Sequence, residues 1–253
     1  MRSNIYETDK LVAEYLLFHY GTPDEVLPYR DGPHTALEYP ARCVAECVDV
    51  ARIPISARAL DLGCAVGRSS FELARHCEEV VGVDFSSAFI GSASTLQSHG
   101  ELPYLRADEG KLTTPLTARV PAEIARERVR FCVGDAMALP ADLGSFNVVL
   151  LANLIDRLPD PERCLERLPQ LVKPGGQLIV TSPYTWLEGF TPTARWLGGY
   201  ERDGEPISTL GALSKRLDTA FELRETKDLP FLIREHVRKF QWSVAQASIW
   251  TRR

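Results

Sequence analysis

Short apolar runs alternate with amphipathic stretches from about residue 57 to the end of the chain. The runs richest in Val, Ile and Leu span residues 57–63, 78–86, 129–135, 145–153 and 176–183. Runs without regular polar positions are typical of parallel strands that are buried on both faces of a sheet. Because helical stretches lie between them, the pattern predicts an α/β fold with a doubly wound, Rossmann-like sheet.

The helical stretches and two late strands complete this prediction. Helical spacing is found at residues 68–76, 87–100 and 160–172. The last of these stops at Pro174-Gly175-Gly176, a breaker whose role is structural. Residues 221–233 and 241–250 predict two more strands, and the second alternates as an antiparallel strand does. We therefore expect a seven-stranded sheet whose last strand is antiparallel.

Two segments fall outside the sheet and its helices. Residues 1–50 contain an aromatic-rich helical stretch and a second helix, which predict an N-terminal helical cap or lid on a core of residues 51–253. Residues 101–128 are too long for an ordinary connection between a helix and a strand, so we expect an inserted hairpin or irregular flap. The whole chain, residues 1–253, is expected to form one domain.

Charge and hydropathy exclude several classes of protein. The chain has 29 Lys and Arg residues against 34 Asp and Glu, a net charge of −5, which disfavours a nonspecific nucleic-acid clamp. No apolar run approaches the roughly 20 residues of a membrane-spanning helix, and the first residues lack an apolar signal core. The sequence predicts a soluble, cytoplasmic protein without membrane or nucleic-acid partners.

The cysteines and histidines do not form a pattern typical of a metal site. The six cysteines include no CxxC pair, and we expect reduced, mostly buried thiols. Cys43 and Cys47 would share a helix face, but no second Cys or His pair completes a site. The five histidines form no HxxxH or HExxH pattern. We predict no metal.

The sharpest local signal is the turn after the first strand, Asp61-Leu62-Gly63-Cys64-Ala65-Val66-Gly67-Arg68. Small residues at positions 63, 65 and 67 let a ligand approach the backbone, with amide groups and a helix N-terminus expected to face it. A dinucleotide fingerprint requires glycine at positions 65 and 68, where this chain has alanine and arginine. Asp61 would repel a phosphate and suits a positive group, such as the ammonium of an amino acid.

This turn resembles the first motif of the class I S-adenosylmethionine-dependent methyltransferases, D/E-x-G-x-G-x-G, with Ala65 in place of the middle glycine. The resemblance implies that the cofactor is S-adenosylmethionine and the product S-adenosylhomocysteine. In that family the motif cradles the methionine part. The residues implied in this contact are Asp61, Gly63, Cys64, Ala65, Gly67 and Arg68.

Three further motifs follow in the order that this family has. Val83-Asp84-Phe85-Ser86 ends the second strand, where Asp84 is placed either to bind both ribose hydroxyls or to cap the next helix. Gly134-Asp135-Ala136 is similar to the segment that reads the adenine edge, and Asn153 occupies the fourth-motif position. Since ligands bind at the carboxyl edge of such sheets, four motifs at successive strand ends predict one cofactor site.

Longer segments resemble one narrower group, the 4-mercaptohistidine (5-thiohistidine) N1-methyltransferases of ovothiol biosynthesis. These segments are residues 4–8, 14–21, 60–75, 152–159, 182–192, 196–199, 230–236 and 239–242. The resemblance implies methyl transfer to an imidazole nitrogen of a thiol-bearing histidine. In that group the methyltransferase is often fused to an iron enzyme that joins cysteine sulfur to histidine. Because this chain lacks a histidine cluster for iron, we expect a free-standing methyltransferase that depends on a separate iron-dependent C–S bond-forming enzyme.

The same resemblance suggests where the substrate binds. Asn153 is expected to hold the imidazole or a backbone group, and we predict Asn153, Tyr6 and His19 as catalytic. The alternatives are a turn residue at the strand end for Asn153 and a structural role for His19. Asp156 and Arg157 are predicted to pair with the substrate's ammonium and carboxylate, or with each other. The other predicted substrate contacts are Tyr15 and Tyr20 in the lid, Tyr184, Trp186 and Glu188 in a pocket wall, and Arg234 in a second polar cluster. For Tyr184 and Trp186, packing in the core is the alternative.

Two other functions fit the motifs. The first is methylation of another small amino acid or imidazole derivative. The second is a noncatalytic, S-adenosylmethionine-binding regulatory module, which the intact Asp61, Asp84 and Asp135 disfavour.

Overall fold

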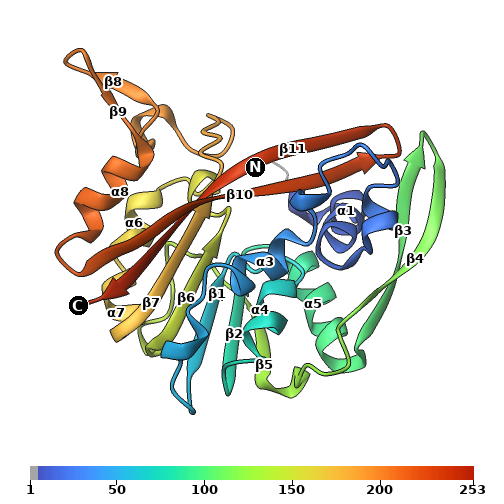
Figure 1. Ribbon diagram of the computed structural model, residues 1–253, viewed down its shortest axis with the longest axis horizontal. Helices are drawn as coiled ribbons and strands as arrows, with labels where there is room; N and C mark the ends of the chain where they lie inside the picture. Colours follow the sequence, from blue (N-terminus) through green and yellow to red (C-terminus); the bar gives the residue numbers. More distant parts are fainter. Residues whose placement is uncertain (1–4) are drawn as a thin grey trace.

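The computed structural model describes residues 5–253, so that Asn4 of the first resembling segment lies outside the described residues. This part of the chain forms a seven-stranded sheet with the strand order β10-β11-β7-β6-β1-β2-β5 (Figure 1). The strands are β1 (Arg58–Leu62), β2 (Glu79–Asp84), β5 (Val129–Val133), β6 (Phe146–Ala152), β7 (Val172–Ser182), β10 (Phe221–His236) and β11 (Lys239–Arg252). The first five are parallel, and β11 is antiparallel to β7. The predicted sheet and its antiparallel last strand are confirmed.

Helices cover both faces of the sheet. On one face lie α3 (Tyr39–Ala45), α4 (Arg68–Leu73) and α5 (Ser87–His99). On the other lie α6 (Pro161–Leu165), α7 (Leu168–Leu171) and α8 (Thr209–Leu217). Successive residues of β6, such as Leu150 and Leu151, pack into the two different cores. This is why the strands have continuous apolar runs rather than alternating patterns.

The segment before β1 lies beside a hairpin inserted between α5 and β5. The hairpin consists of β3 (Glu101–Glu109) and β4 (Leu112–Arg119), within the stretch where an inserted hairpin or flap was predicted. The long hairpin β10–β11 runs across the sheet toward it (Figure 1), and the amide of Val237 donates to the carbonyl of Asp108. Helix α1 (Asp9–Tyr20) packs against β3 and β10.

The remaining elements are short. They are η1 (Ile5–Glu7), α2 (Pro23–Val26), η2 (His34–Ala36), η3 (Val50–Arg52), η4 (Arg126–Arg128), η5 (Ala141–Leu143), η6 (Ile155–Arg157), η7 (Thr193–Arg195), β8 (Tyr200–Arg202) and β9 (Glu205–Ile207). The sequence pattern did not predict the β8–β9 hairpin, because its strands have only three residues each.

Two details of the region before β7 differ from the prediction. The helix predicted over residues 160–172 is two short helices, α6 and α7, because the chain leaves the helix at Glu166 and Pro169 opens the next one. The breaker Pro174-Gly175-Gly176 lies inside β7 and not before it. Gly175 has φ 74°, and the pairing with β6 shifts register between Phe146 and Val148, so the strand bulges here instead of ending.

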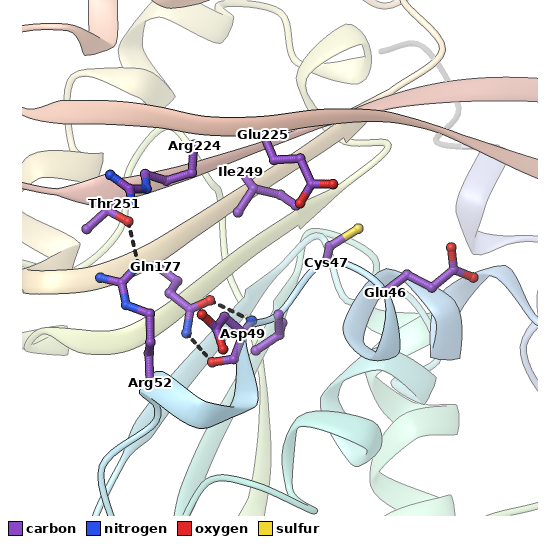
Figure 2. Close-up of a pocket in the computed structure, with 10 residues that line it drawn as sticks. Glu46, Cys47, Asp49, Arg52, Gln177, Arg224, Glu225, Ile249 and Thr251 are labelled. Carbon is purple, nitrogen blue, oxygen red and sulfur yellow. Dashed lines mark hydrogen bonds between the residues drawn. The ribbon is translucent and has the colours of Figure 1, made fainter.

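A hollow of about 360 Å³ lies between the loop that precedes β1 and strands β7 and β11 (Figure 2). The side chain of Gln177 accepts from the amide of Asp49 and donates to its carbonyl. Arg52 donates to the Thr251 hydroxyl and the Gly175 carbonyl. These paired groups fix the connection from the N-terminal segment into β1, well before the carboxyl end of β7.

The thiols agree with the prediction, since all six cysteines are free and five of them are buried. Among residues 5–253, no helix combines the length and the apolar character needed to span a bilayer.

Candidate functional site

The carboxyl ends of the parallel strands bring the four sequence motifs together. Asp61 in β1 pairs in register with Gly82 in β2 and Leu150 in β6. Asp84 at the end of β2 pairs with Val133, directly before the Gly134-Asp135-Ala136 segment. The motifs therefore occupy one continuous edge, as the prediction of a single cofactor site requires.

The turn after β1 adopts the left-handed backbone that its small residues suggest. Gly63, Ala65 and Gly67 have φ of 80°, 47° and 90°. A Cβ at Gly67 would lie 2.6 Å from the Phe131 ring, and one at Gly63 would lie 2.9 Å from Leu154. Both glycines are thus required by packing as well as by φ. Ala65 accepts the left-handed conformation at a cost of roughly 1–2 kcal/mol.

Several amide groups of this turn that were expected to face a ligand are instead paired within the protein. Gly63 and Cys64 donate to the Val83 carbonyl, and Ala65 donates to Asp84. The amide of Arg68 donates to Nδ1 of His19, and its guanidinium pairs with Glu72 at 2.8 Å. The Cys64 thiol is buried. Cys64 and Arg68 therefore maintain the turn, and the recognition that the structure offers here comes from carboxylates.

Asp61 is a buried carboxylate with half of its hydrogen-bonding capacity unused. The Ser70 hydroxyl donates to Oδ2 at 2.6 Å, whereas Oδ1 has no partner within residues 5–253. Burial raises the pKa of Asp61 to about 7. A buried carboxylate oxygen without a donor is costly. The ammonium of a methionine moiety would supply that donor and the compensating charge, so this residue fits the cofactor that the sequence motif implies.

Asp84 joins the two cofactor loops. Oδ2 accepts from the amide of Ala65, and Oδ1 accepts from the amide of Ser86, both at 2.9 Å. The alternative that Asp84 caps α5 is wrong, since the Ser86 hydroxyl accepts from Phe89 at that helix start. Burial raises the pKa of Asp84, which its three backbone donors oppose. Each oxygen keeps a lone pair with which to accept from a ribose hydroxyl.

The neighbouring residues offer a surface for a flat ring. Phe85 is 67% exposed, unusual for a residue that directly follows a buried strand. Such an exposed aromatic face suits stacking against adenine. Oδ1 of Asp135 accepts from the amide of Met137 at 2.8 Å, and Ala136 is buried beneath it.

Asn153 lies where β6 ends, in a left-handed conformation with φ 52°. Its amide donates to the Thr181 carbonyl at 2.9 Å. The side-chain oxygen accepts from the Tyr39 hydroxyl at 2.8 Å. The sequence reading missed Tyr39 and Thr181, because neither lies in a motif and the contact joins residues 114 positions apart.

Asp156 and Arg157 form a charged pair three to four residues after Asn153. Oδ2 of Asp156 accepts from Arg157 at 2.9 Å and from the amide of Thr185 at 3.0 Å. Arg157 is partly exposed, whereas Asp156 is completely buried and its Oδ1 has no partner among the described residues. The guanidinium lies over the Phe190 ring, 5.0 Å from its centroid. The predicted alternative of mutual pairing is confirmed, and one carboxylate oxygen is left over. Phe190 is a further residue that the sequence reading missed.

Tyr6 lies between the cofactor motifs and this charged pair. Its ring packs against Tyr15, Phe89 and Phe190, with centroids 6.2, 5.8 and 6.2 Å apart. Burial raises its pKa; Arg157 opposes this shift, and the Asp84 and Asp156 carboxylates add to it. The segment is fastened by Glu7, whose carboxylate accepts from the amides of Ser87 and Ala88 at the start of α5. In this conformation it covers the strand ends.

His19 and Tyr20 support the turn after β1 from the same helix, α1. The Tyr20 hydroxyl donates to the Val66 carbonyl at 2.8 Å. Nδ1 of His19 accepts from the Arg68 amide, and burial lowers the pKa of His19 to about 3. An imidazole with an occupied Nδ1 and such a low pKa is a poor proton acceptor. The prediction of His19 as a catalytic group is therefore corrected: it holds the cofactor turn.

Three predicted substrate contacts lie elsewhere. Trp186 is buried, stacks on Trp196 and donates to the Thr209 hydroxyl, so it belongs to the core. Arg234 donates to the Glu25 carbonyl and to Asp108, where it joins β10 to the inserted hairpin. Glu188 is exposed and accepts from Thr193. Long side chains near a motif in sequence can point away from the site. For Trp186 the alternative of packing in the core is confirmed.

Tyr184, by contrast, stays at the site. Its hydroxyl donates to the side-chain oxygen of Gln246 in β11 at 3.0 Å. Burial raises its pKa to about 12, and the Asp156 carboxylate adds to this shift.

Comparison with known proteins agrees with this geometry. Residues 60–180 match a family described as a methyltransferase domain. A ubiquinone biosynthesis O-methyltransferase of Coxiella burnetii (strain Dugway 5J108-111) is 28% identical over 123 residues, which cover 49% of this chain and 42% of that protein. The chain thus matches less than half the length of this curated relative.

Solved structures share the fold at low identity. A S-adenosylmethionine-dependent methyltransferase from Methanosarcina mazei superposes with a TM-score of 0.52 at 20% identity, covering 79% of this chain and 94% of that one. The N-methyltransferase NodS from Bradyrhizobium japonicum WM9, in complex with S-adenosylhomocysteine, gives 0.51 at 14% identity, covering 95% and 98%.

We predict that Asp84→Ala weakens S-adenosylhomocysteine binding by about 10- to 150-fold, since the loss of a charge-assisted pair of hydrogen bonds costs roughly 1.5–3 kcal/mol. Isothermal titration calorimetry measures the affinity, and circular dichroism checks that the variant is folded. An affinity within about twofold of wild type in a folded variant would contradict the assignment.

We expect S-adenosylhomocysteine affinity to rise by about tenfold between pH 6 and 8. With a pKa of about 7, Asp61 is mostly protonated at pH 6 and mostly ionised at pH 8, and only the carboxylate attracts an ammonium. In the free protein the same raised pKa means that this group's contribution to stability falls as the pH rises from about 4 to 7. Calorimetry across this range tests the affinity, and Asp61→Asn should remove its rise. If the affinity of Asp61→Asn still rises with pH, another titratable group causes the rise.

We predict that Tyr6→Phe lowers kcat/KM about tenfold, because the phenol borders Arg157 and both site carboxylates. The ring contacts remain, so the melting temperature should change by less than about 2 °C. Steady-state kinetics and differential scanning calorimetry measure the two effects. A large drop in melting temperature with normal turnover would assign the segment to stability alone.

Proposed function

We propose that this chain, which is a class I S-adenosylmethionine-dependent methyltransferase, methylates an imidazole nitrogen of a thiol-bearing histidine to give ovothiol. The substrate assignment begins with the sequence resemblance and is developed here from the residues beside the cofactor edge. The acceptor's origin, a separate iron-dependent enzyme that forms the C–S bond, is part of the same proposal.

The observation that carries the proposal is the pair of the buried Asp156 and the partly exposed Arg157. Oδ1 of Asp156 has no donor among residues 5–253, although Asp156 is fully buried. An ammonium would satisfy this oxygen, and the adjacent guanidinium provides charge for a carboxylate. An amino acid zwitterion presents both groups. A quinone has no donor for the Asp156 oxygen, and a simple phenol has neither an ammonium for Asp156 nor a carboxylate for Arg157.

Methyl transfer requires the protein mainly to position the cofactor and the acceptor relative to each other. S-adenosylmethionine supplies an activated methyl group, which the ring nitrogen's lone pair attacks in line while the bond from carbon to the sulfonium sulfur breaks. Asp61 and Asp84 are placed to hold the two ends of the cofactor, and Asp156 with Arg157 to hold the amino acid end of the acceptor. In this proposal Asn153, at the end of β6, binds the reacting ring. Tyr6 and Phe190, whose rings pack against each other, are proposed to exclude water from this space.

The alternative is another small amino acid or imidazole derivative with the same zwitterionic end. The pair Asp156 and Arg157 serves both acceptors equally, so only the ring distinguishes them. Purified protein is therefore incubated with methyl-labelled cofactor and four acceptors: 5-thiohistidine, histidine, ergothioneine, and a mercaptoimidazole without the amino acid group. Mass spectrometry reads the labelled product and its position.

We predict that 5-thiohistidine is preferred over histidine by at least ~100-fold in kcat/KM, because polar groups that hold the sulfur stay unpaired with plain histidine. The mercaptoimidazole should also be poor, since it leaves Asp156 unsatisfied. Equal turnover of histidine and 5-thiohistidine would overturn the thiohistidine assignment and leave the methyltransferase class intact. Efficient turnover of the mercaptoimidazole would show that Asp156 and Arg157 are not needed to bind the acceptor.

A further inference from the structure

We infer that Tyr39 is a positioning residue that fixes the direction of the Asn153 side-chain amide, so that only its N–H donors face the acceptor. The inference rests on the proposed function, because it assigns the group that holds the acceptor's sulfur. Neither the sequence motifs nor the resemblance pointed to Tyr39.

Tyr39 is held rigidly. It is the first residue of α3 and only 2% exposed. Its ring stacks on Phe18 of α1, with centroids 6.0 Å apart and planes at 21°, and packs against Phe231 of β10 at 4.9 Å. A phenol clamped between two rings keeps its hydroxyl in one place, which is what a positioning group requires.

Three polar groups meet at that hydroxyl. The Tyr39 oxygen lies 2.8 Å from Oδ1 of Asn153 and 2.7 Å from Oγ1 of Thr181. Thr181 also accepts from the backbone amide of Asn153 at 3.3 Å. If Tyr39 donates to Asn153, the Thr181 proton is donated to the Tyr39 oxygen. Every proton in the cluster is then used once.

The reversed amide is less well satisfied. With Nδ2 of Asn153 toward Tyr39, the phenol would donate to Thr181, whose own proton would then have no acceptor among these groups. The thiol of Cys43, one turn further along α3, is only a weak acceptor. The complete pairing therefore places Oδ1 toward Tyr39 and the two N–H donors on the opposite side.

This direction has a consequence for the chemistry. An amide that presents only donors binds an atom with a lone pair, such as a thiolate or thione sulfur. Asn153 also has φ 52°, a strained conformation that its neighbours must maintain. Hydrogen bonds to the sulfur would hold this softer nucleophile away from the methyl group and leave the ring nitrogen to react.

The first experiment compares Tyr39→Phe with Asn153→Asp. Tyr39→Phe keeps the stacked ring and removes the 2.8 Å hydrogen bond to Oδ1 of Asn153, so that only the longer contact from the Thr181 hydroxyl, at 3.4 Å, still holds this oxygen. We expect kcat with 5-thiohistidine to fall about tenfold and the share of S-methylated product to rise. In Asn153→Asp the carboxylate still accepts from Tyr39 but has no donors, and kcat should fall about 100-fold. Tyr29→Phe is the matched control, since its hydroxyl donates to the Val237 carbonyl away from the site.

S-adenosylhomocysteine affinity separates positioning from damage to the fold, and it should stay within about twofold of wild type in Tyr39→Phe and in Tyr29→Phe. Full activity and unchanged product ratio in Tyr39→Phe would overturn the inference. So would normal activity in Asn153→Asp, because an oxygen acceptor alone would then suffice.

A measurement without substrate keeps this result distinct from the proposed function. In protein labelled with ¹³C and ¹⁵N asparagine, Asn153→Asp identifies the Asn153 side-chain signals. On Tyr39→Phe the Cγ resonance should move more than the Nδ2 resonance, since the lost bond is to the oxygen. The opposite pattern overturns the inference, whatever acceptor the enzyme uses. If the wild-type protein does not methylate 5-thiohistidine but the Cγ signal moves as expected, the proposed substrate is wrong. The inferred direction of the Asn153 amide is then still supported.

Discussion

The Asp84 carboxylate is the interaction on which the site's geometry depends. One oxygen accepts from Ala65 in the turn after β1, and the other accepts from Ser86 at the start of α5. Two loops on neighbouring parallel strands are thereby fixed relative to each other, with the carboxylate between them. Parallel strands end at the same edge, so this single tie also sets the distance between the methionine and ribose positions of the cofactor site.

The N-terminal segment packs over the carboxyl ends of these strands. Glu7 binds the start of α5, and Tyr20 binds the Val66 carbonyl, so the segment is attached to both of the loops that Asp84 joins. Tyr6 lies between the two attachments, over Arg157 and the site carboxylates. Hydrogen bonds thus join the N-terminal segment to both cofactor loops. A displacement of either loop would therefore also move this segment.

Asp61 and Asp156 share a physical feature that links stability to function. Both are buried, and each has one carboxylate oxygen to which no group in the described part of the chain donates. Burial of such groups is unfavourable in the free protein and is relieved when a donor or cation arrives. Two buried acceptors at one strand edge therefore fit two ammonium groups, one on the cofactor and one on the proposed acceptor.

The sequence alone determined the doubly wound sheet, its antiparallel last strand and the order of the cofactor motifs, because hydrophobic periodicity and turn residues are local properties. It also placed Asp61, Asp84 and Asn153, since strand ends are readable from the chain. Tertiary structure decided which side chains meet. Tyr39 lies 114 positions from Asn153 in the sequence and still contacts it. Trp186 and Arg234 instead donate to Thr209 and Glu25, although the sequence predicted that both would contact the substrate. Side-chain direction depends on partners from distant segments, and no local pattern encodes those partners.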